Sequence, residues 1–262
     1  MKILILGDIY GEDGKNAVAS YLPFMKKQLN PNFVIANAEN VSQGGKGLTK
    51  KDYDYLLNSG IDYFTMGNHT FRNKDIYNYI DKVDNLIRPA NLEDEDKGKG
   101  FIIFKHLNKR ILLFNLLGEV YISNKVKNPF KIADKILEEN KDKYDLAILD
   151  IHAEATAEKI VLANYLSKKN VGIVFGTHTH IQTADERILN NKTAYITDVG
   201  MCGVFDSAIG ANFDEVELKM SNNNKKLKFI EAKGNVRINA ILVTLYDNSL
   251  KPMSIERIVI NP

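Results

Sequence analysis

The residues with the clearest capacity for chemistry are His178 and His180, which follow the apolar run at residues 171–175 with one threonine between them. In a turn after a strand, this spacing lets both imidazoles face one point, whereas on a helix it would direct them apart. Imidazole is a common ligand of transition metals, so the pair is a candidate metal site. An isolated pair is more often two solvent-exposed loop histidines than a metal site, and the choice between the two depends on the rest of the chain.

Four further segments place metal-type ligands directly after an apolar run: Gly7-Asp8, Ala38-Glu39-Asn40, Gly67-Asn68-His69 and Asp150-Ile151-His152. In open α/β sheets, ligands bind outside the carboxyl ends of the strands, so these side chains are expected to share one cleft. Their donor atoms are nitrogen and oxygen only, which suits iron, zinc, manganese or cobalt. So many ligands exceed the needs of one ion, and they suit two ions roughly 3.5–4 Å apart that share a carboxylate.

The composition is that of an ordinary globular protein, with 262 residues, 44% hydrophobic and 26% charged residues, and a net charge of +2. This charge creates no strong field for polyanions, although it leaves a local contact with RNA open. Cys202 is the only cysteine, which excludes an internal disulfide and a thiolate metal cage. The apolar run at residues 3–6 is too short for a signal peptide, and no run is long enough to cross a membrane. We therefore expect a cytoplasmic enzyme or binding protein.

Strand-type and helix-type segments alternate along most of the chain, which predicts an α/β fold. The expected strands lie at 3–6, 33–36, 61–66, 101–104, 111–117, 146–149, 171–175, 195–197, 236–246 and 255–260. The expected helices lie at 16–29, from Thr49, from about 70 to 80, and at 129–140, 156–168 and 214–220. Glycines at 11 and 14 predict a loop, and residues 222–226 a polar turn. With no linker and no internal repeat, a single domain spanning residues 1–262 is expected.

The order of the motifs resembles the calcineurin-like metallophosphoesterase superfamily, in which D-x-H, a bridging carboxylate, G-N-H-[DE], a lone histidine and G-H-x-H follow one another. Tyr10 stands where the superfamily has its first histidine, and Thr70 replaces the acidic residue after His69. These departures resemble the YmdB-like branch of bacterial metallophosphoesterases, as do GKGLT at 45–49, RPAN at 88–91, HAEAT at 152–156 and TDVGM at 197–201. The resemblance covers nearly the whole chain. It implies an α/β/β/α sandwich of two mixed sheets flanked by helices.

The resemblance also implies a role for each candidate residue of a two-metal centre. It puts the first metal on Asp8, Asn40 and His180, the second on Asn68, His152 and His178, and the bridging carboxylate at Glu39. Asn40 would fill the place that Tyr10 leaves, and its neutral amide oxygen favours a harder ion, iron first and then manganese, with zinc or cobalt also compatible. His69 is left as the general acid.

The expected activity is that of a binuclear metal-dependent phosphodiesterase, in which a metal-bridging hydroxide attacks phosphorus and His69 protonates the leaving oxygen. The resemblance points to cyclic nucleotides as substrates, with 2′,3′-cyclic nucleotides favoured and 3′,5′-cyclic nucleotides compatible. Two alternatives stay open. One is a phosphomonoesterase or nuclease on the same site, and the other is a metal-containing regulatory or RNA-binding module. RNA ends as partners and a homo-oligomer are expectations at the level of the family.

Several residues outside the candidate ligand set have other interpretations. Asp150 and Asp198 could each orient a metal ligand through a second contact, or serve packing and capping. Lys225, Lys226 and Lys228 are interpreted as part of a solvated turn. His106 and Cys202 are interpreted as packed or surface residues without a chemical role.

Overall fold

Strand β1 (Lys2–Tyr10) directs its apolar side chains alternately into two different cores. Leu4 and Leu6 belong to one core, whereas Ile3 and Ile5 belong to another. Neighbouring residues of a strand point to opposite faces, so β1 is covered on both sides. This double burial explains why the sequence at 3–6 is apolar without alternation.

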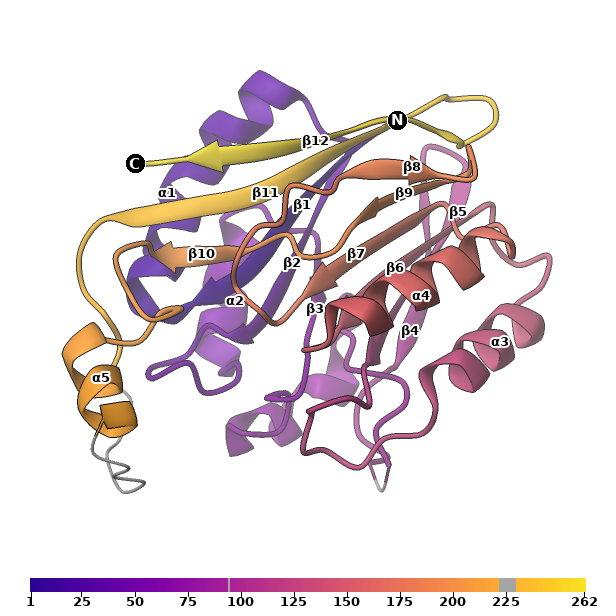
Figure 1. The fold of residues 1–262 in the computed structure, drawn as a ribbon. Helices are drawn as coiled ribbons and strands as arrows, with labels where there is room; N and C mark the ends of the chain where they lie inside the picture. Colours follow the sequence, from indigo (N-terminus) through magenta and orange to yellow (C-terminus); the bar gives the residue numbers. More distant parts are fainter. Residues whose placement is uncertain (94, 222–229) are drawn as a thin grey trace.

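The computed structural model describes residues 1–93, 95–221 and 230–262, and its strands form two sheets (Figure 1). The first sheet has the order β12 (Pro252–Ile260), β11 (Val236–Leu245), β10 (Met201–Val204), β1, β2 (Phe33–Asn40) and β3 (Tyr63–Thr65). The second has the order β4 (Phe101–His106), β5 (Lys109–Leu117), β6 (Leu146–His152), β7 (Ile173–Thr177), β9 (Thr193–Ile196) and β8 (Arg187–Leu189). Each sheet contains a run of parallel strands with antiparallel strands added toward one or both edges, so both sheets are mixed.

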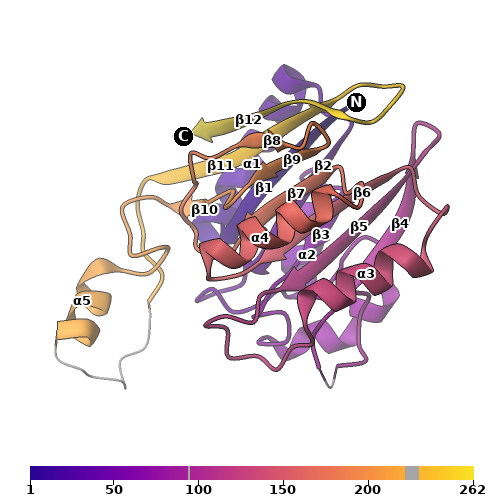
Figure 2. The ribbon, with the colours of Figure 1, turned by 45° about the vertical axis from the view of Figure 1, so that its right-hand side comes forward.

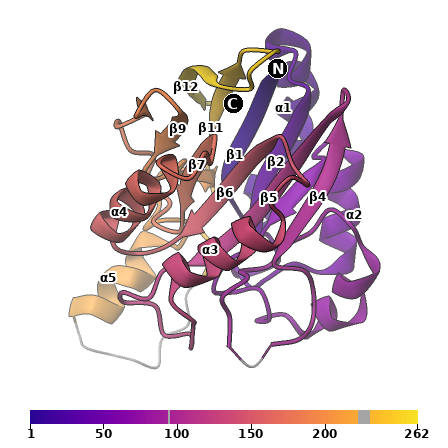
Figure 3. The same cartoon turned by 90° about the vertical axis from the view of Figure 1, so that its right-hand side faces the viewer.

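Three apolar cores separate four layers of structure. The central core lies between the sheets and contains Ile35 of β2 and Ile148 of β6. One outer core lies under the helices α1 (Gly11–Leu29) and α2 (Lys50–Asn58), and the other lies under α3 (Pro129–Glu139) and α4 (Thr156–Ser167). Figure 3 shows the two pairs of helices on opposite outer faces of the paired sheets. The predicted α/β/β/α sandwich is therefore confirmed.

The parallel strands place polar side chains at one end of the sandwich. Their carboxyl ends meet at the same edge of each sheet, and Asp8, Glu39 and His152 lie within the last three residues of β1, β2 and β6. The pairing of β1 with β2 shifts register on both sides of Asp8. Such irregularities redirect a side chain out of the regular alternation of a strand. The two-sheet arrangement also revises the expectation drawn from a single open sheet, because the candidate residues come from two facing sheets.

Several elements differ from the sequence-based expectations. Helix α1 begins at Gly11 rather than after a loop, and Gly14 in its first turn packs against the carbonyl of Cys202, where a Cβ would not fit. The helix expected up to residue 80 consists of two 3₁₀ helices, η1 (Lys74–Asn78) and η2 (Ile80–Lys82). Strands β8 and β10 were not expected.

Other expectations about single segments have different outcomes. Thr49 caps α2 as predicted, since its side chain accepts from the backbone N–H of Asp52. The helix predicted at 214–220 is α5 (Phe213–Ser221), which lies beyond one end of the sandwich (Figure 2). The turn predicted at 222–226 and the lysines at 225, 226 and 228 lie outside the described residues. No helix in the described ranges is both long and apolar enough to span a bilayer.

We predict that Gly7→Ala destabilises the protein by about 1–3 kcal/mol, because overpacking a tight contact costs this much. A Cβ at Gly7 would overlap the carbonyl oxygen of Gly200, which accepts a 2.9 Å hydrogen bond from the Asp8 backbone N–H. Urea unfolding followed by circular dichroism measures the effect. Ser20→Ala on the exposed face of α1 is the control and should change stability by less than about 0.5 kcal/mol. An unchanged free energy of unfolding for Gly7→Ala would contradict this account of the β1–Gly200 contact.

Candidate metal centre

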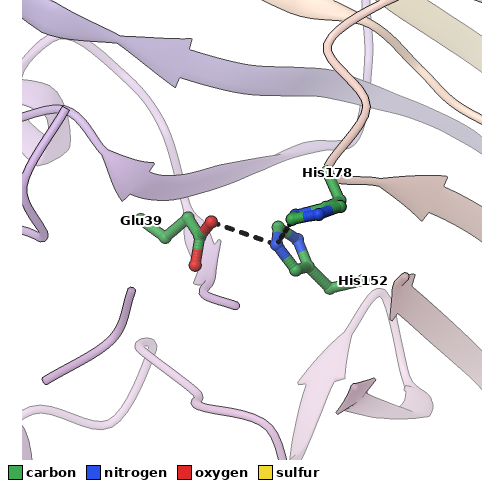
Figure 4. Close-up of side chains that lie close together, drawn as sticks. All are labelled: Glu39, His152 and His178. Atoms are coloured by element: carbon green, nitrogen blue, oxygen red, sulfur yellow. Dashed lines mark hydrogen bonds and ion pairs between the residues drawn. The ribbon is translucent and has the colours of Figure 1, made fainter. Parts of the chain in front are cut away.

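Glu39 and His152 meet where the two sheets face each other. Glu39 comes from β2 of the first sheet and His152 from β6 of the second, and their side chains are 1% and 0% exposed. Glu39 Oε1 lies 3.0 Å from His152 Nε2, as Figure 4 shows together with the neighbouring His178. The ligand atoms of these three residues lie within 4.8 Å of one another, close enough to hold one metal ion together.

A chain of hydrogen bonds fixes the orientation of the His152 ring. Thr177 Oγ1 donates to Asp150 Oδ1 at 2.7 Å and lies 2.8 Å from His152 Nδ1. Since the hydroxyl proton of Thr177 is used on Asp150, its oxygen accepts from His152 Nδ1–H. The other ring nitrogen, Nε2, therefore faces Glu39, and it carries either a proton for that carboxylate or a lone pair for a metal ion. Asp150 thus orients a candidate ligand through Thr177, one of the two roles that the sequence left open for it.

The surroundings of His152 Nε2 contain more acceptors than one proton can serve. Nε2 lies 3.0 Å from Glu39 Oε1, 2.9 Å from Asn68 Oδ1 and 3.0 Å from His178 Nδ1. His178 Nε2 lies 3.1 Å from Glu154 Oε2, so it carries the proton and leaves Nδ1 with a lone pair toward the centre. Lone pairs of four residues therefore converge on one small volume. A metal cation is the species that satisfies such a set.

The pKa values of the buried groups also show that this centre stabilises a positive charge. Burial opposes a charge on His152, but the Glu39 carboxylate prevails and raises the pKa of His152 to about 9. Burial also opposes a charge on Glu39, and His152 nevertheless lowers the pKa of that carboxyl well below its ordinary value. Burial, followed by repulsion from His152, lowers the pKa of His178 to about 3. A single proton on His152 thus stands in for a cation among these ligands.

A second set of ligand atoms lies beside the first, around Asp8 and His180. Asp8 Oδ1 is buried and has no hydrogen-bond partner among the described residues, and burial raises the pKa of Asp8 to about 6. His180 Nδ1 donates to the carbonyl of Ile209 at 2.9 Å, so its Nε2 lone pair points inward, 3.9 Å from Asp8 Oδ1. A buried acceptor without a donor is costly unless a cation or water completes it. The residues present therefore fit a metal at this position.

Asn40 joins the two sets of ligand atoms. Its Nδ2 lies 3.2 Å from His180 Nε2 and 3.4 Å from Glu39 Oε1, and its Oδ1 lies 2.7 Å from His69 Nδ1. In this orientation the amide oxygen faces His69 rather than the centre. To ligate a metal, the Asn40 amide must turn about its Cβ–Cγ bond so that Oδ1 and Nδ2 exchange places. Its NH₂ group then donates to His69 Nδ1.

His69 lies at the rim of the centre and contacts a residue that the sequence reasoning missed. The backbone N–H of His69 donates to Glu39 Oε2 at 2.7 Å, and its side chain is 27% exposed. Arg72 Nη1 lies 2.6 Å from His69 Nε2. Burial lowers the pKa of His69, and the nearby Arg72 guanidinium lowers it further against the opposing pull of Glu39. Nothing in the sequence marks Arg72, because it follows His69 in an irregular turn.

The turn that carries both histidines has a strained backbone. His178 and His180 have φ angles of +100° and +65°, which L-residues adopt at a cost of about 1–3 kcal/mol each. Asp198 holds the turn by accepting from Thr179 N at 3.0 Å and from Thr179 Oγ1 at 2.8 Å. Lys159 of α4, 0% exposed like Asp198, donates to Asp198 Oδ2 at 2.8 Å and to the Thr177 carbonyl at 2.7 Å. From the sequence alone, Asp198 was one candidate for a residue that orients a metal ligand, whereas Lys159 was not.

The structure brings every sequence-predicted site residue into this network. The predicted set is Asp8, Glu39, Asn40, Asn68, His69, His152, His178 and His180, and each of them contacts at least one other. Tyr10, at the position of the missing histidine, packs edge-on against the His180 ring at 5.6 Å. His106 lies away from the centre against Phe33, and the buried Cys202 thiol donates to the Asn239 carbonyl. Burial raises the pKa of Cys202 to about 12, which keeps it protonated.

The chain thus has two facing mixed sheets with buried carboxylates and imidazoles at their shared end. The solved structure of the calcineurin-like phosphoesterase YfkN from Bacillus subtilis has this fold, with a TM-score of 0.58 at 10% identity over 100% of this chain and 90% of that chain. A family model described as YmdB-like protein matches residues 4–258. The chain belongs to the YmdB-like family and is a metallophosphoesterase. The fold of this class implies that divalent metal ions are bound.

Two relatives are similar to this chain over nearly their whole length. The 2′,3′-cyclic-nucleotide 2′-phosphodiesterase of Bacillus subtilis (strain 168) is 41% identical over 261 residues, which are 100% of this chain and 97% of that protein. A solved structure described as a novel phosphatase from Mycoplasma pneumoniae is 36% identical, with a TM-score of 0.93 over 100% of this chain and 93% of that chain.

We predict that Lys159→Met destabilises the protein by about 3–5 kcal/mol, because it leaves the Asp198 carboxylate buried without its counter-charge. The double variant Lys159→Met/Asp198→Asn should recover part of this loss, since the uncompensated charge is gone. Urea unfolding measures both variants, with Lys168→Met on the exposed end of the same segment as the control. Equal destabilisation by the single and the double variant would contradict a charge-based role for the pair.

Proposed function

We propose that this protein is a binuclear metal-dependent phosphodiesterase that hydrolyses 2′,3′-cyclic nucleotides. The observation that carries the proposal is the pair of unsatisfied ligand sets with Glu39 between them. Around His152 Nε2, acceptors of several residues converge, and around Asp8 Oδ1 a buried acceptor has no donor among the described residues. Glu39 contacts both the His152 side and the Asn40 side.

Each ligand set is assigned to one metal ion. Asp8, Asn40 and His180 would hold the first ion; Asn68, His152 and His178 would hold the second; Glu39 would bridge them. Iron is the favoured ion and manganese the next, because the Asn40 amide is a harder and weaker donor than the imidazole it replaces. Two ions there would supply the charge that binds a phosphate ester and would lower the pKa of a water molecule toward neutral.

The residues of the chain supply the remaining parts of the mechanism. Asp150, through Thr177, holds His152 in the tautomer that ligates, and Asp198 holds the strained turn of His178 and His180. His69 would provide the proton for the leaving ribose oxygen from Nε2. As arranged, that nitrogen accepts from Arg72 and Nδ1 donates the ring proton to Asn40, so Nε2 gains the proton when the Asn40 amide turns its NH₂ group toward Nδ1. When Arg72 turns from His69 to the substrate, its guanidinium can pair with a phosphate oxygen.

The choice of substrate follows the relative from Bacillus subtilis, whose name specifies 2′,3′-cyclic nucleotides and which is 41% identical to this chain. The same centre could also accept 3′,5′-cyclic nucleotides. A second candidate function is phosphomonoester hydrolysis, which is favoured by the description of the Mycoplasma pneumoniae structure as a phosphatase.

We predict that His69→Ala keeps the metal content of the protein and lowers kcat for 2′,3′-cyclic AMP by about 10²–10⁴, the usual contribution of a general acid. Metal content is measured by inductively coupled plasma mass spectrometry and turnover by product chromatography. His106→Ala, at the end of β4, is the matched control and should behave as the wild type. Full activity of His69→Ala would show that another group protonates the leaving oxygen.

We also predict that chelation abolishes activity on every phosphoester and that iron or manganese restores it, because the ligand sets act only when filled. His178→Ala should bind about one metal ion per chain where the wild type binds two.

A substrate panel distinguishes the alternatives, and it comprises 2′,3′-cyclic AMP, 3′,5′-cyclic AMP, adenosine 3′-phosphate and a short RNA. Faster hydrolysis of the monoester or of internal RNA bonds would replace the proposed function with the corresponding alternative.

A further inference from the structure

A cavity of about 550 Å³ opens beside His69, on the side of the centre that faces α2. Its wall is formed by the first turns of α1 and α2, the loop that follows β2, and the turn at residues 72–74. Ser42, which lines it, lies two residues after Asn40 in the chain, and Arg72, which also lines it, contacts His69. The cavity and the candidate metal centre are therefore immediate neighbours.

The two acidic side chains of this cavity already have partners within it, since both are paired with the same lysine. Glu12 and Asp52 are the two acids that line it, and Lys15 Nζ lies 2.8 Å from a carboxylate oxygen of each. Asp52 also accepts from the hydroxyls of Ser42 and Thr49 at 2.6 and 2.7 Å. These acids are thus committed to Lys15 and to the local structure.

Four other cations line the same cavity without an acidic partner among the described residues: Lys46, Lys51, Arg72 and Lys74. All four side chains are exposed. Arg72 contacts only the neutral His69 ring within the described part of the chain, and Lys74 lies over the Tyr77 ring at 5.3 Å. Cations gathered around a concave surface repel one another and create a positive potential that attracts an anion. Guanidinium and ammonium groups are the side chains that bind phosphate oxygens.

We propose that this cavity binds a second phosphate of the substrate, next to the phosphate that is cleaved at the metal centre. The inference rests on the proposed function, which places the cleaved cyclic phosphate beside His69. The ligand class is then a nucleotide that carries a 2′,3′-cyclic phosphate and a further phosphate on its 5′ side. Either a 5′-phosphorylated mononucleotide or the 3′ end of an RNA chain supplies that second phosphate.

Equilibrium binding tests the inference without relying on turnover. The His69→Ala holoenzyme, slowed in catalysis, is titrated calorimetrically with adenosine 3′-phosphate, adenosine 3′,5′-bisphosphate and the dinucleotide ApAp. The second phosphate should tighten binding by roughly tenfold or more, since one charge-assisted hydrogen bond is worth about that factor. Equal affinity for the bisphosphate and ApAp identifies the shared phosphate as the recognised group, whereas a stronger preference for ApAp identifies an RNA end.

The Lys51→Gln/Lys74→Gln variant should remove this advantage, because both exposed side chains can be changed without disturbing the core. Lys27→Gln/Lys168→Gln, with two exposed lysines that do not line the cavity, is the matched control and should keep the advantage. Identical dissociation constants for the monophosphate and the bisphosphate would overturn the inference, and so would an advantage that survives in Lys51→Gln/Lys74→Gln. If neither ligand binds, the inference also fails.

The two proposals fail in different ways. Hydrolysis of 2′,3′-cyclic AMP by the wild type without any bisphosphate advantage would leave the proposed function standing and remove the second-phosphate site. A lysine-dependent bisphosphate advantage in a protein that hydrolyses no cyclic nucleotide would retain the phosphate site and remove the proposed function.

Discussion

The contact between Glu39 and His152 joins the two sheets at their polar end, and the arrangement of the site depends on it. Both side chains are almost completely buried, where an isolated charge is strongly unfavourable. Without a metal, the pair is maintained by a proton on His152, whose pKa is raised to about 9. A metal ion bound there would take over the role of that proton. The apolar core between the sheets sets the spacing of the strands, so packing determines where the two side chains meet.

Contacts with neighbouring residues hold the candidate ligands in place. Asp150 acts on His152 through Thr177, and Asp198 acts on the turn of His178 and His180 through Thr179. Both carboxylates are themselves buried. Asp150 accepts a hydrogen bond from Thr177, and Asp198 forms an ion pair with Lys159. A ligand turn with positive φ angles at two histidines can persist only when its surroundings specify it in this way. The candidate centre is thus preorganised by neighbouring residues outside the ligand set.

Much of the fold and nearly all of the candidate ligands could be predicted from the sequence, for a physical reason. Asp8, Glu39 and His152 each end an apolar run, and the ends of parallel strands meet at one edge. Lys159 and Arg72 could not be found in this way. Lys159 has the spacing of an ordinary helical lysine, and its burial appears only when α4 packs on the second sheet. Arg72 lies in an irregular turn, and its contact with His69 depends on the path of the backbone after β3.

The central claim is that Glu39 bridges two metal ions held by ligands from both sheets. Anomalous diffraction from crystals of the metal-loaded protein tests it most directly. The account predicts two peaks roughly 3.5–4 Å apart with the Glu39 carboxylate between them, one beside Asp8 and His180 and the other beside His152 and His178. A single peak, or peaks that do not contact Glu39, would contradict it.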